Sequence, residues 1–136
     1  MYLDFSSLEK AVSSLEKAIL RAEKTKNDDI LRDAVIQRFE YTYELCWKML
    51  KRQIEMDSPT PALVDTLSFK ELIREGAEKG FIDDVAAWIM YREQRNITSH
   101  VYNENKAISV YNTAVEFLKD AKSLLNKLKK NKNDSY

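Results

Sequence analysis

The segment from Arg92 to Tyr102 concentrates the side chains that could carry out chemistry. It reads REQRNITSHVY and holds two arginines, amide and hydroxyl side chains, a tyrosine and the only histidine of the sequence. A guanidinium and an amide can bind a phosphate, and an imidazole that titrates near neutral pH can move a proton. We therefore predict that Arg95, Asn96 and His100 form a phosphate-binding or proton-transfer site.

The spacing of Arg95 and His100 decides whether the two side chains can meet. Five residues along an ideal helix place them about 140° apart and ~7.5 Å apart along the axis, so they would not share a face. Ile97 and Thr98 are β-branched and Ser99 is a poor mid-helix residue, which predicts that the helix ends here and that the chain can turn His100 back toward Arg95. The alternative is a simple helix end, where the helix dipole favours a protonated histidine.

Other site chemistries have little support in the sequence. A zinc site needs several cysteine or histidine ligands, and the chain has one of each, Cys46 and His100, far apart. Glycine-rich phosphate-binding loops and the GxSxG motif are absent, so we expect neither a metal site nor a cofactor. A Cys46–His100 nucleophilic pair is an alternative, but Cys46 lies between Leu45 and Trp47 in a predicted helix, which favours a buried structural thiol.

Composition limits the class of protein. The 136 residues predict a single domain over 1–136. The 22 basic and 22 acidic residues cancel, so any nucleic-acid site must be local. One cysteine excludes an intrachain disulfide framework. The N-terminus lacks the features of a signal peptide and no apolar run approaches ~18 residues, so we expect a cytoplasmic protein without a membrane partner.

The apolar pattern predicts an all-α fold. The chain has two glycines and two prolines, and its apolar residues recur at steps of three and four. Short connections make neighbouring helices antiparallel, so we predict an up-and-down four-helix bundle with one additional short helix. The predicted helices run from about Ser7 to Thr25, from Ile30 to Met56, within Pro61 to Gly80, from Asp83-Asp84 to about Thr98, and from Asn105 or Lys106 to a polar tail that frays from about residue 130.

Local signals mark several helix ends. Ser6 with Glu9, and Ser68 with Glu71, have the spacing of a capping box. The polar break before Ile30 also ends in residues that cap helices well. Gly80 is placed to follow a helix C-terminus.

Two sequence patterns resemble a known family. RNITSHVY at 95–102 is similar to the R-polar-x3-H signature of the HEPN superfamily, and Tyr102 extends it to the R-x4-H-x-Y form of HepT toxins. IQRFEYTYELCWKMLK at 36–51 resembles the matching helix of the nucleotidyltransferase substrate-binding protein family, a HEPN branch usually encoded beside a minimal (MNT) nucleotidyltransferase. SLEKAVSSLEKAI near the start and RNITSHVYNE at 95–104 agree, so the resemblance covers nearly the whole chain.

The resemblance implies a fold, partners and residue roles. The family is a four- to five-helix bundle that forms a homodimer or a larger homo-oligomer and assembles with an MNT-type nucleotidyltransferase. In the HepT branch the protein is a metal-independent ribonuclease toxin, and its partner acts as the antitoxin by transferring AMP to the motif tyrosine. By this resemblance Arg95 would bind or orient a phosphate and Asn96 would assist it. His100 would transfer a proton, and Tyr102 would accept AMP.

Three functional hypotheses follow. The chain is the substrate-binding partner of a nucleotidyltransferase in a toxin–antitoxin pair, an active ribonuclease neutralised by AMPylation of Tyr102, or a structural bundle without a site. RNA cleavage through the 2′-hydroxyl needs a base, an acid and charge stabilisation, and a two-fold axis would supply a second His100. Tyr41, Tyr43 and Tyr91 are candidates for stacking on RNA bases, with core packing as the alternative.

Overall fold

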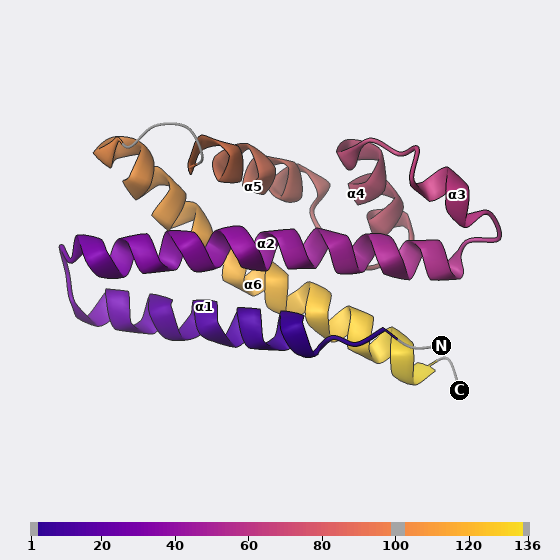
Figure 1. The fold of residues 1–136 in the computed structure, drawn as a ribbon, viewed down its shortest axis with the longest axis horizontal. Coiled ribbons are helices and arrows are strands. Elements are labelled where there is room, and N and C mark those ends of the chain that lie inside the picture. Colours follow the sequence, from indigo (N-terminus) through magenta and orange to yellow (C-terminus); the bar gives the residue numbers. More distant parts are fainter. Residues whose placement is uncertain (1–2, 99–102, 135–136) are drawn as a thin grey trace.

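The computed structural model describes residues 3–98 and 103–134 (Figure 1). Within these ranges every regular element is a helix, so the predicted all-α class is confirmed. No helix in the described ranges is both long and apolar enough to cross a bilayer. The elements are α1 (Ser6–Lys24), α2 (Asp29–Asp57), α3 (Pro61–Val64), α4 (Phe69–Glu78), α5 (Val85–Thr98) and α6 (Glu104–Asp134).

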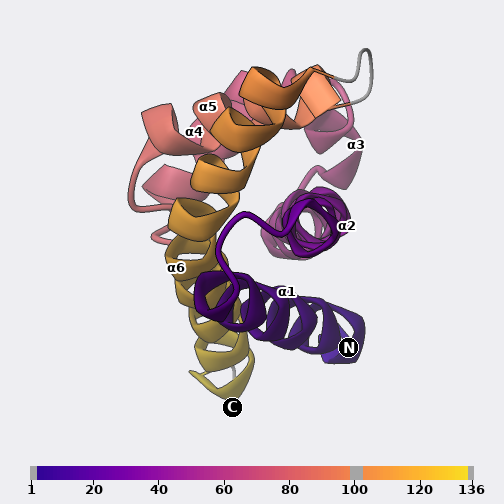
Figure 2. The ribbon, with the colours of Figure 1, turned by 90° about the vertical axis from the view of Figure 1, so that its left-hand side faces the viewer.

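Helix α2 runs through the middle of the molecule and the other helices pack around it (Figure 1). The chain direction alternates from α1 to α2, α5 and α6, as expected for an up-and-down bundle. Helix α6 crosses the bundle obliquely, so that it contacts α1, α2 and α5 (Figure 2). The start of α1 and the end of α6 lie at the same end of the molecule.

The helix bounds differ from the predicted ones mainly in two places. The stretch from Pro61 onward contains a one-turn helix, α3, in addition to the predicted short helix, which is α4. Pro61 occupies the first turn of α3, where its missing N–H costs nothing. Helix α6 continues to Asp134, so residues 131–134 are part of this helix.

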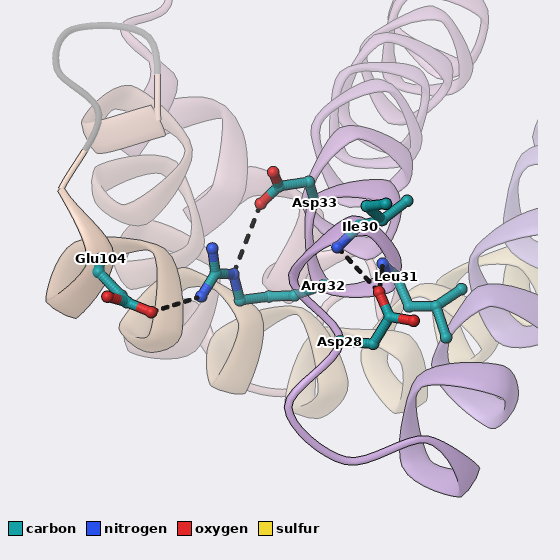
Figure 3. Close-up of polar contacts among 6 residues, drawn as sticks. All are labelled: Asp28, Ile30, Leu31, Arg32, Asp33 and Glu104. Atoms are coloured by element: carbon teal, nitrogen blue, oxygen red, sulfur yellow. Dashed lines mark hydrogen bonds and ion pairs between the residues drawn. The ribbon is translucent and has the colours of Figure 1, made fainter.

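Two of the predicted N-terminal caps are confirmed and one is wrong. The Asp28 carboxylate accepts hydrogen bonds from the backbone N–H groups of the second and third residues of α2, at 3.0 and 3.1 Å (Figure 3). Ser68 and Glu71 form a complete capping box at the start of α4. The expected box at Ser6 is absent, because Ser6 is already helical and its N–H donates to Asp4 Oδ1 at 2.9 Å.

The two glycines occupy positions where a side chain would crowd its neighbours or strain the backbone. Gly76 lies on the buried side of α4, where a Cβ would stand 3.1 Å from Leu50 Cδ2 of α2 and 3.0 Å from Ile82 Cγ1. Gly80 has a φ of +86°, which confirms its predicted place after the helix end. The N–H of Phe81 donates to the Gly76 carbonyl oxygen at 2.8 Å, so the chain turns sharply toward α5.

The core is centred on five buried rings, here called the aromatic cluster: Phe39 and Tyr43 of α2, Trp88 and Tyr91 of α5, and Phe117 of α6. The centroid of the Phe117 ring lies 5.1 to 6.2 Å from those of the other four. Its contacts with Phe39, Trp88 and Tyr91 are edge to face, an arrangement that aromatic rings favour. The cluster therefore holds α5 against both α2 and α6.

Polar side chains also form hydrogen bonds between the packed helices. Thr42 Oγ1 of α2 donates to the Ala11 carbonyl oxygen of α1 at 3.2 Å. The Tyr91 hydroxyl donates to the Asp120 carboxylate of α6. Burial and this hydrogen bond raise the pKa of the Tyr91 phenol, which therefore stays protonated and serves as the donor.

The central place of Phe117 can be tested by truncation. We expect Phe117→Ala to lower the free energy of unfolding by about 3–5 kcal/mol, because the lost ring leaves a cavity among four aromatic neighbours. Urea denaturation followed by circular dichroism measures the change. Ile30→Ala is the control, since Ile30 is 78% exposed. Truncating such a surface residue should change stability by less than about 0.5 kcal/mol. Equal stability of the two variants would contradict this view of the core.

Candidate functional site

The two arginines of α5 lie on the same side of this helix as a buried aromatic residue that precedes them. Trp88 is buried against rings of α2 and α6. Arg92 and Arg95 follow Trp88 by four and seven residues, a spacing that keeps all three on one side of the helix. Arg95 also lies in the last turn of α5, where the helix dipole favours a cation. The packing of Trp88 thus sets the direction of both guanidinium groups.

An acidic residue of α2 holds Arg95. Its Nε lies 3.1 Å from Glu44 Oε1, and each of the two side chains is 30% exposed. The second oxygen of Glu44 lies 3.9 Å from Lys48 Nζ, one turn along α2. Asn96 lines the same cleft as Arg95 and Glu44. The structure therefore brings Arg95 and Asn96, two of the predicted site residues, to one place beside α2.

A cleft with a volume of about 410 Å³ lies between α2, α3, α4 and α5. Its charged lining residues are Glu44, Lys51, Arg92 and Arg95, so cations outnumber carboxylates. Lys51 Nζ lies 2.8 Å from Asp65 Oδ1, and this contact raises the pKa of Lys51. The other lining residues are Tyr43, Trp47, Val64, Leu67, Ser68, Phe69, Leu72 and Asn96.

One wall of the cleft is aromatic. Trp47 of α2 and Phe69 of α4 are both partly exposed and meet edge to face, with ring centroids 6.3 Å apart. The guanidinium carbon of Arg92 lies 4.4 Å from the Phe69 centroid, within the range of a cation–π contact. The wall thus combines a half-buried indole with a cation stacked on a neighbouring ring.

Tyr43 lies deeper in the same cleft. It is 1% exposed, and its hydroxyl oxygen has no hydrogen-bond partner among the described residues. Burial raises the pKa of the phenol, while the positive charge of Arg92 acts in the opposite direction. The Tyr43 hydroxyl is therefore a neutral, buried group that can still donate or accept a hydrogen bond.

His100 and Tyr102 lie outside the described residues, so their predicted roles stay predictions. The described residues on either side of them are both tied to α2. Arg95 pairs with Glu44 before the segment, and Arg32 Nη1 lies 3.7 Å from Glu104 Oε1 after it. Figure 3 shows Arg32 reaching from the first turns of α2 to the start of α6. Helix α2 therefore anchors the chain on both sides of 99–102.

Three of the other candidates, Tyr43, Tyr91 and Cys46, belong to the core, whereas Tyr41 lies at the surface. Tyr43 and Tyr91 are buried in the aromatic cluster, so base stacking on their rings is wrong as a prediction. Tyr41 is 39% exposed, and its hydroxyl shares a hydrogen bond of 2.8 Å with Ser14 Oγ. Cys46 is 0% exposed, and burial raises the pKa of its thiol, which confirms the structural interpretation of this cysteine.

Lys51, Phe69 and Arg92 were not among the residues predicted for the site. Tyr43, Trp47 and Lys51 follow one another at steps of four on α2, a signal that they share a face. No spacing in the sequence links this face to Phe69, because α4 is a separate helix that meets α2 only through tertiary packing. The sequence therefore predicts only the α2 face of the cleft, and the contribution of α4 follows from the tertiary structure.

Comparison with known proteins gives the family. A family model described as nucleotidyltransferase substrate binding protein like matches residues 3–130. A Haemophilus influenzae protein named probable ribonuclease HepT is 35% identical over 135 residues, which covers 93% of this chain and 92% of that protein.

Solved structures agree with this match. A Haemophilus influenzae structure, described as revealing the fold of a substrate binding domain of a nucleotidyltransferase, has a TM-score of 0.86 at 34% identity and covers 93% of this chain and 99% of that chain. A Thermus thermophilus protein has a TM-score of 0.71 at 28% identity and covers 89% of this chain and 98% of that chain. The chain belongs to the nucleotidyltransferase substrate binding protein-like family.

Proposed function

We propose that this chain is the substrate-binding partner subunit of a minimal, MNT-type nucleotidyltransferase and the HEPN-type component of a cytoplasmic toxin–antitoxin pair. The family match over residues 3–130 carries the proposal. The similarity to a solved substrate binding domain of a nucleotidyltransferase supports it, because that domain is covered over 99% of its length. A substrate-binding subunit of this kind would consist of helices α1 to α6, which make up most of the described chain.

Association with the partner is the direct test. The chain is co-expressed with a minimal, MNT-type nucleotidyltransferase, and only the partner carries an affinity tag. We expect the two proteins to co-purify and to elute together in size-exclusion chromatography at micromolar concentration. An unrelated untagged helical bundle of similar size serves as the control for non-specific retention. Separate elution of two folded proteins would overturn the proposal.

An active, metal-independent ribonuclease is the second candidate. The 35% identity with a protein named probable ribonuclease HepT favours it, as does the cationic lining of the cleft beside Arg95. In this reaction the 2′-oxygen attacks the adjacent phosphorus and the 5′-oxygen leaves with a proton. Arg95 would stabilise the phosphorane charge, Asn96 would orient the phosphate, and His100 would transfer a proton. A homodimer would bring two copies of His100 to one site.

Ribonuclease activity is tested on the isolated protein. Single-stranded RNA is incubated with the wild type and with His100→Ala in the presence of EDTA. We expect cleavage by the wild type and a loss of about 10²-fold or more in the variant, the typical contribution of a general acid or base. Arg74→Gln, on the exposed side of α4, controls for loss of an unrelated cation. Equal persistence of the RNA with wild type and His100→Ala would refute this candidate.

Modification of Tyr102 connects the two candidates. The phenol oxygen would form a bond to the α-phosphorus of ATP, and pyrophosphate would leave. After co-expression with the nucleotidyltransferase, we expect peptide mass spectrometry to find AMP on Tyr102 and none on a Tyr102→Phe chain. An unmodified wild-type chain that still associates with the partner would exclude AMPylation as the means of neutralisation.

A further inference from the structure

We infer that the outer face of α1 is a docking surface for an acidic helix of a partner protein. The residues on this face recur at alternating steps of four and three, and we call them the lysine face: Ser6, Lys10, Ser13, Lys17, Leu20 and Lys24. Such steps keep residues in one stripe, the pattern by which two helices pack side by side. The inference goes beyond the proposed function, because it concerns a surface that can be tested on this chain alone.

The lysine face points away from the core of the bundle. Helix α1 packs against α2 and α6 with its apolar side and forms one edge of the molecule (Figure 2). The buried residues of α1 lie on the side toward these two helices, whereas every residue of the lysine face is exposed. A second helix can therefore approach this face without displacing any part of the bundle.

The cations of this surface have no acidic partners. Lys10, Lys17 and Lys24 form no ion pair within the described ranges 3–98 and 103–134. Arg38 of α2 adds a fourth cation, because its Nη1 donates to the Ser14 carbonyl oxygen of α1 at 2.8 Å. Lys10, Lys17 and Arg38 line a groove of about 400 Å³ between α1 and α2. Cations that lack partners along one surface favour an anionic ligand.

The carboxylates next to these lysines are already paired with α6. Glu9 Oε1 lies 3.2 Å from Lys129 Nζ, and Glu16 forms an ion pair with Lys122. Glu9 and Glu16 each precede a lysine of the lysine face by one residue, about 100° around the helix. Glu9 also borders the groove, but its charge is balanced by Lys129. The acidic and basic residues of α1 are thus separated onto two sides of the helix.

The spacing of the lysines favours a helix as the anionic partner. Lys10, Lys17 and Lys24 recur every seven residues, which is about 10.5 Å along the axis. Carboxylates that recur every seven residues on a second helix have the same spacing, so each lysine can meet one of them. Ser6 and Ser13 lie in the same stripe, and their short side chains let a second helix approach closely.

An apolar residue in the stripe indicates a protein and not a nucleic acid. Leu20 follows Ser13 by seven residues and is 52% exposed. The phosphates of a nucleic acid backbone offer no apolar contact to a leucine, whereas an amphipathic helix can place an apolar side chain against it. The partner helix therefore carries carboxylates at heptad spacing and an apolar residue opposite Leu20.

A synthetic helical peptide serves as the probe for this surface. The peptide is dye-labelled and three heptads long, with glutamates at heptad spacing and a leucine placed to meet Leu20. A control peptide has the same composition, but its glutamates are distributed around the helix. Fluorescence anisotropy measures the binding of each peptide to the full-length chain. We expect the control to bind at least about tenfold more weakly. Binding of the acidic peptide should weaken as salt is added.

Charge reversal tests the assigned lysines. A chain with Lys10→Glu, Lys17→Glu and Lys24→Glu should bind the acidic peptide at least about tenfold more weakly than the wild type. A peptide with lysines in place of its glutamates should bind this reversed chain and not the wild type. Restored binding after exchange of the charges on both sides shows direct pairing, and it also shows that the reversed chain is folded.

Two further variants separate specific docking from general attraction. Lys70→Glu, Lys119→Glu and Lys130→Glu together change the net charge equally at three other exposed lysines, and this chain should bind as the wild type does. Leu20→Ala keeps every charge and should weaken binding by about fivefold, because the leucine loses its apolar contact with the peptide. Attraction by net charge alone would not respond to Leu20→Ala.

Several results would overturn the inference. Equal affinity for the two peptides, or equal losses in the two triple variants, would show that the lysine face is not a helix-docking surface. A 2′-O-methylated RNA that binds at least about tenfold more tightly than the acidic peptide, with binding lost in the reversed chain, would assign the face to nucleic acid. Self-association in sedimentation velocity that the reversed chain lacks would assign it to a second copy.

These failures are distinct from failure of the proposed function. The peptide measurements use the isolated chain and do not depend on a nucleotidyltransferase. A chain that co-purifies with its nucleotidyltransferase but does not bind the acidic peptide retains the proposed function and refutes only the lysine face as a docking surface.

Discussion

The edge-to-face packing of Phe117 against rings of α2 and α5 is the contact on which the geometry of the cleft depends. Its ring lies 5.6 Å from Trp88 and 5.1 Å from Tyr91, so it contacts α5 at two neighbouring positions. Two such contacts determine the rotation of α5 about its own axis. A rotation by one residue, about 100°, would carry Arg92 and Arg95 away from α2. The positions of the two guanidinium groups therefore depend on core contacts in which these groups take no part.

The ion pairs around the cleft orient side chains more than they stabilise the fold. Partly exposed pairs such as Glu44–Arg95 contribute roughly 0–1 kcal/mol, far less than burial of an aromatic ring. Glu44 and Arg32 nevertheless have opposite charges on the same helix, and each pairs with the chain on one side of residues 99–102. Although the net charge of the chain is zero, three cationic side chains and one carboxylate line a single cleft.

Most helices could be predicted because their signals are local. Asp28, the Ser68–Glu71 pair and Gly80 act within a few residues of the ends that they set. The start of α1 was predicted less well, because Asp4 and not Glu9 accepts the hydrogen bond of the Ser6 N–H, and spacing alone does not decide between two nearby acceptors. Helix α3 has a single turn, too short for any hydrophobic period.

The sequence by itself determined that Arg95 and Asn96 adjoin in one helix and that His100 and Tyr102 follow in one motif. It did not separate Tyr43 from Trp47, two aromatic residues four positions apart on one side of α2. Only tertiary packing decided that Tyr43 is 1% exposed while Trp47 is partly exposed, because burial depends on which neighbours cover each side chain. The meeting of Trp47, Phe69 and Arg92 was likewise a tertiary outcome, since these residues come from three different helices.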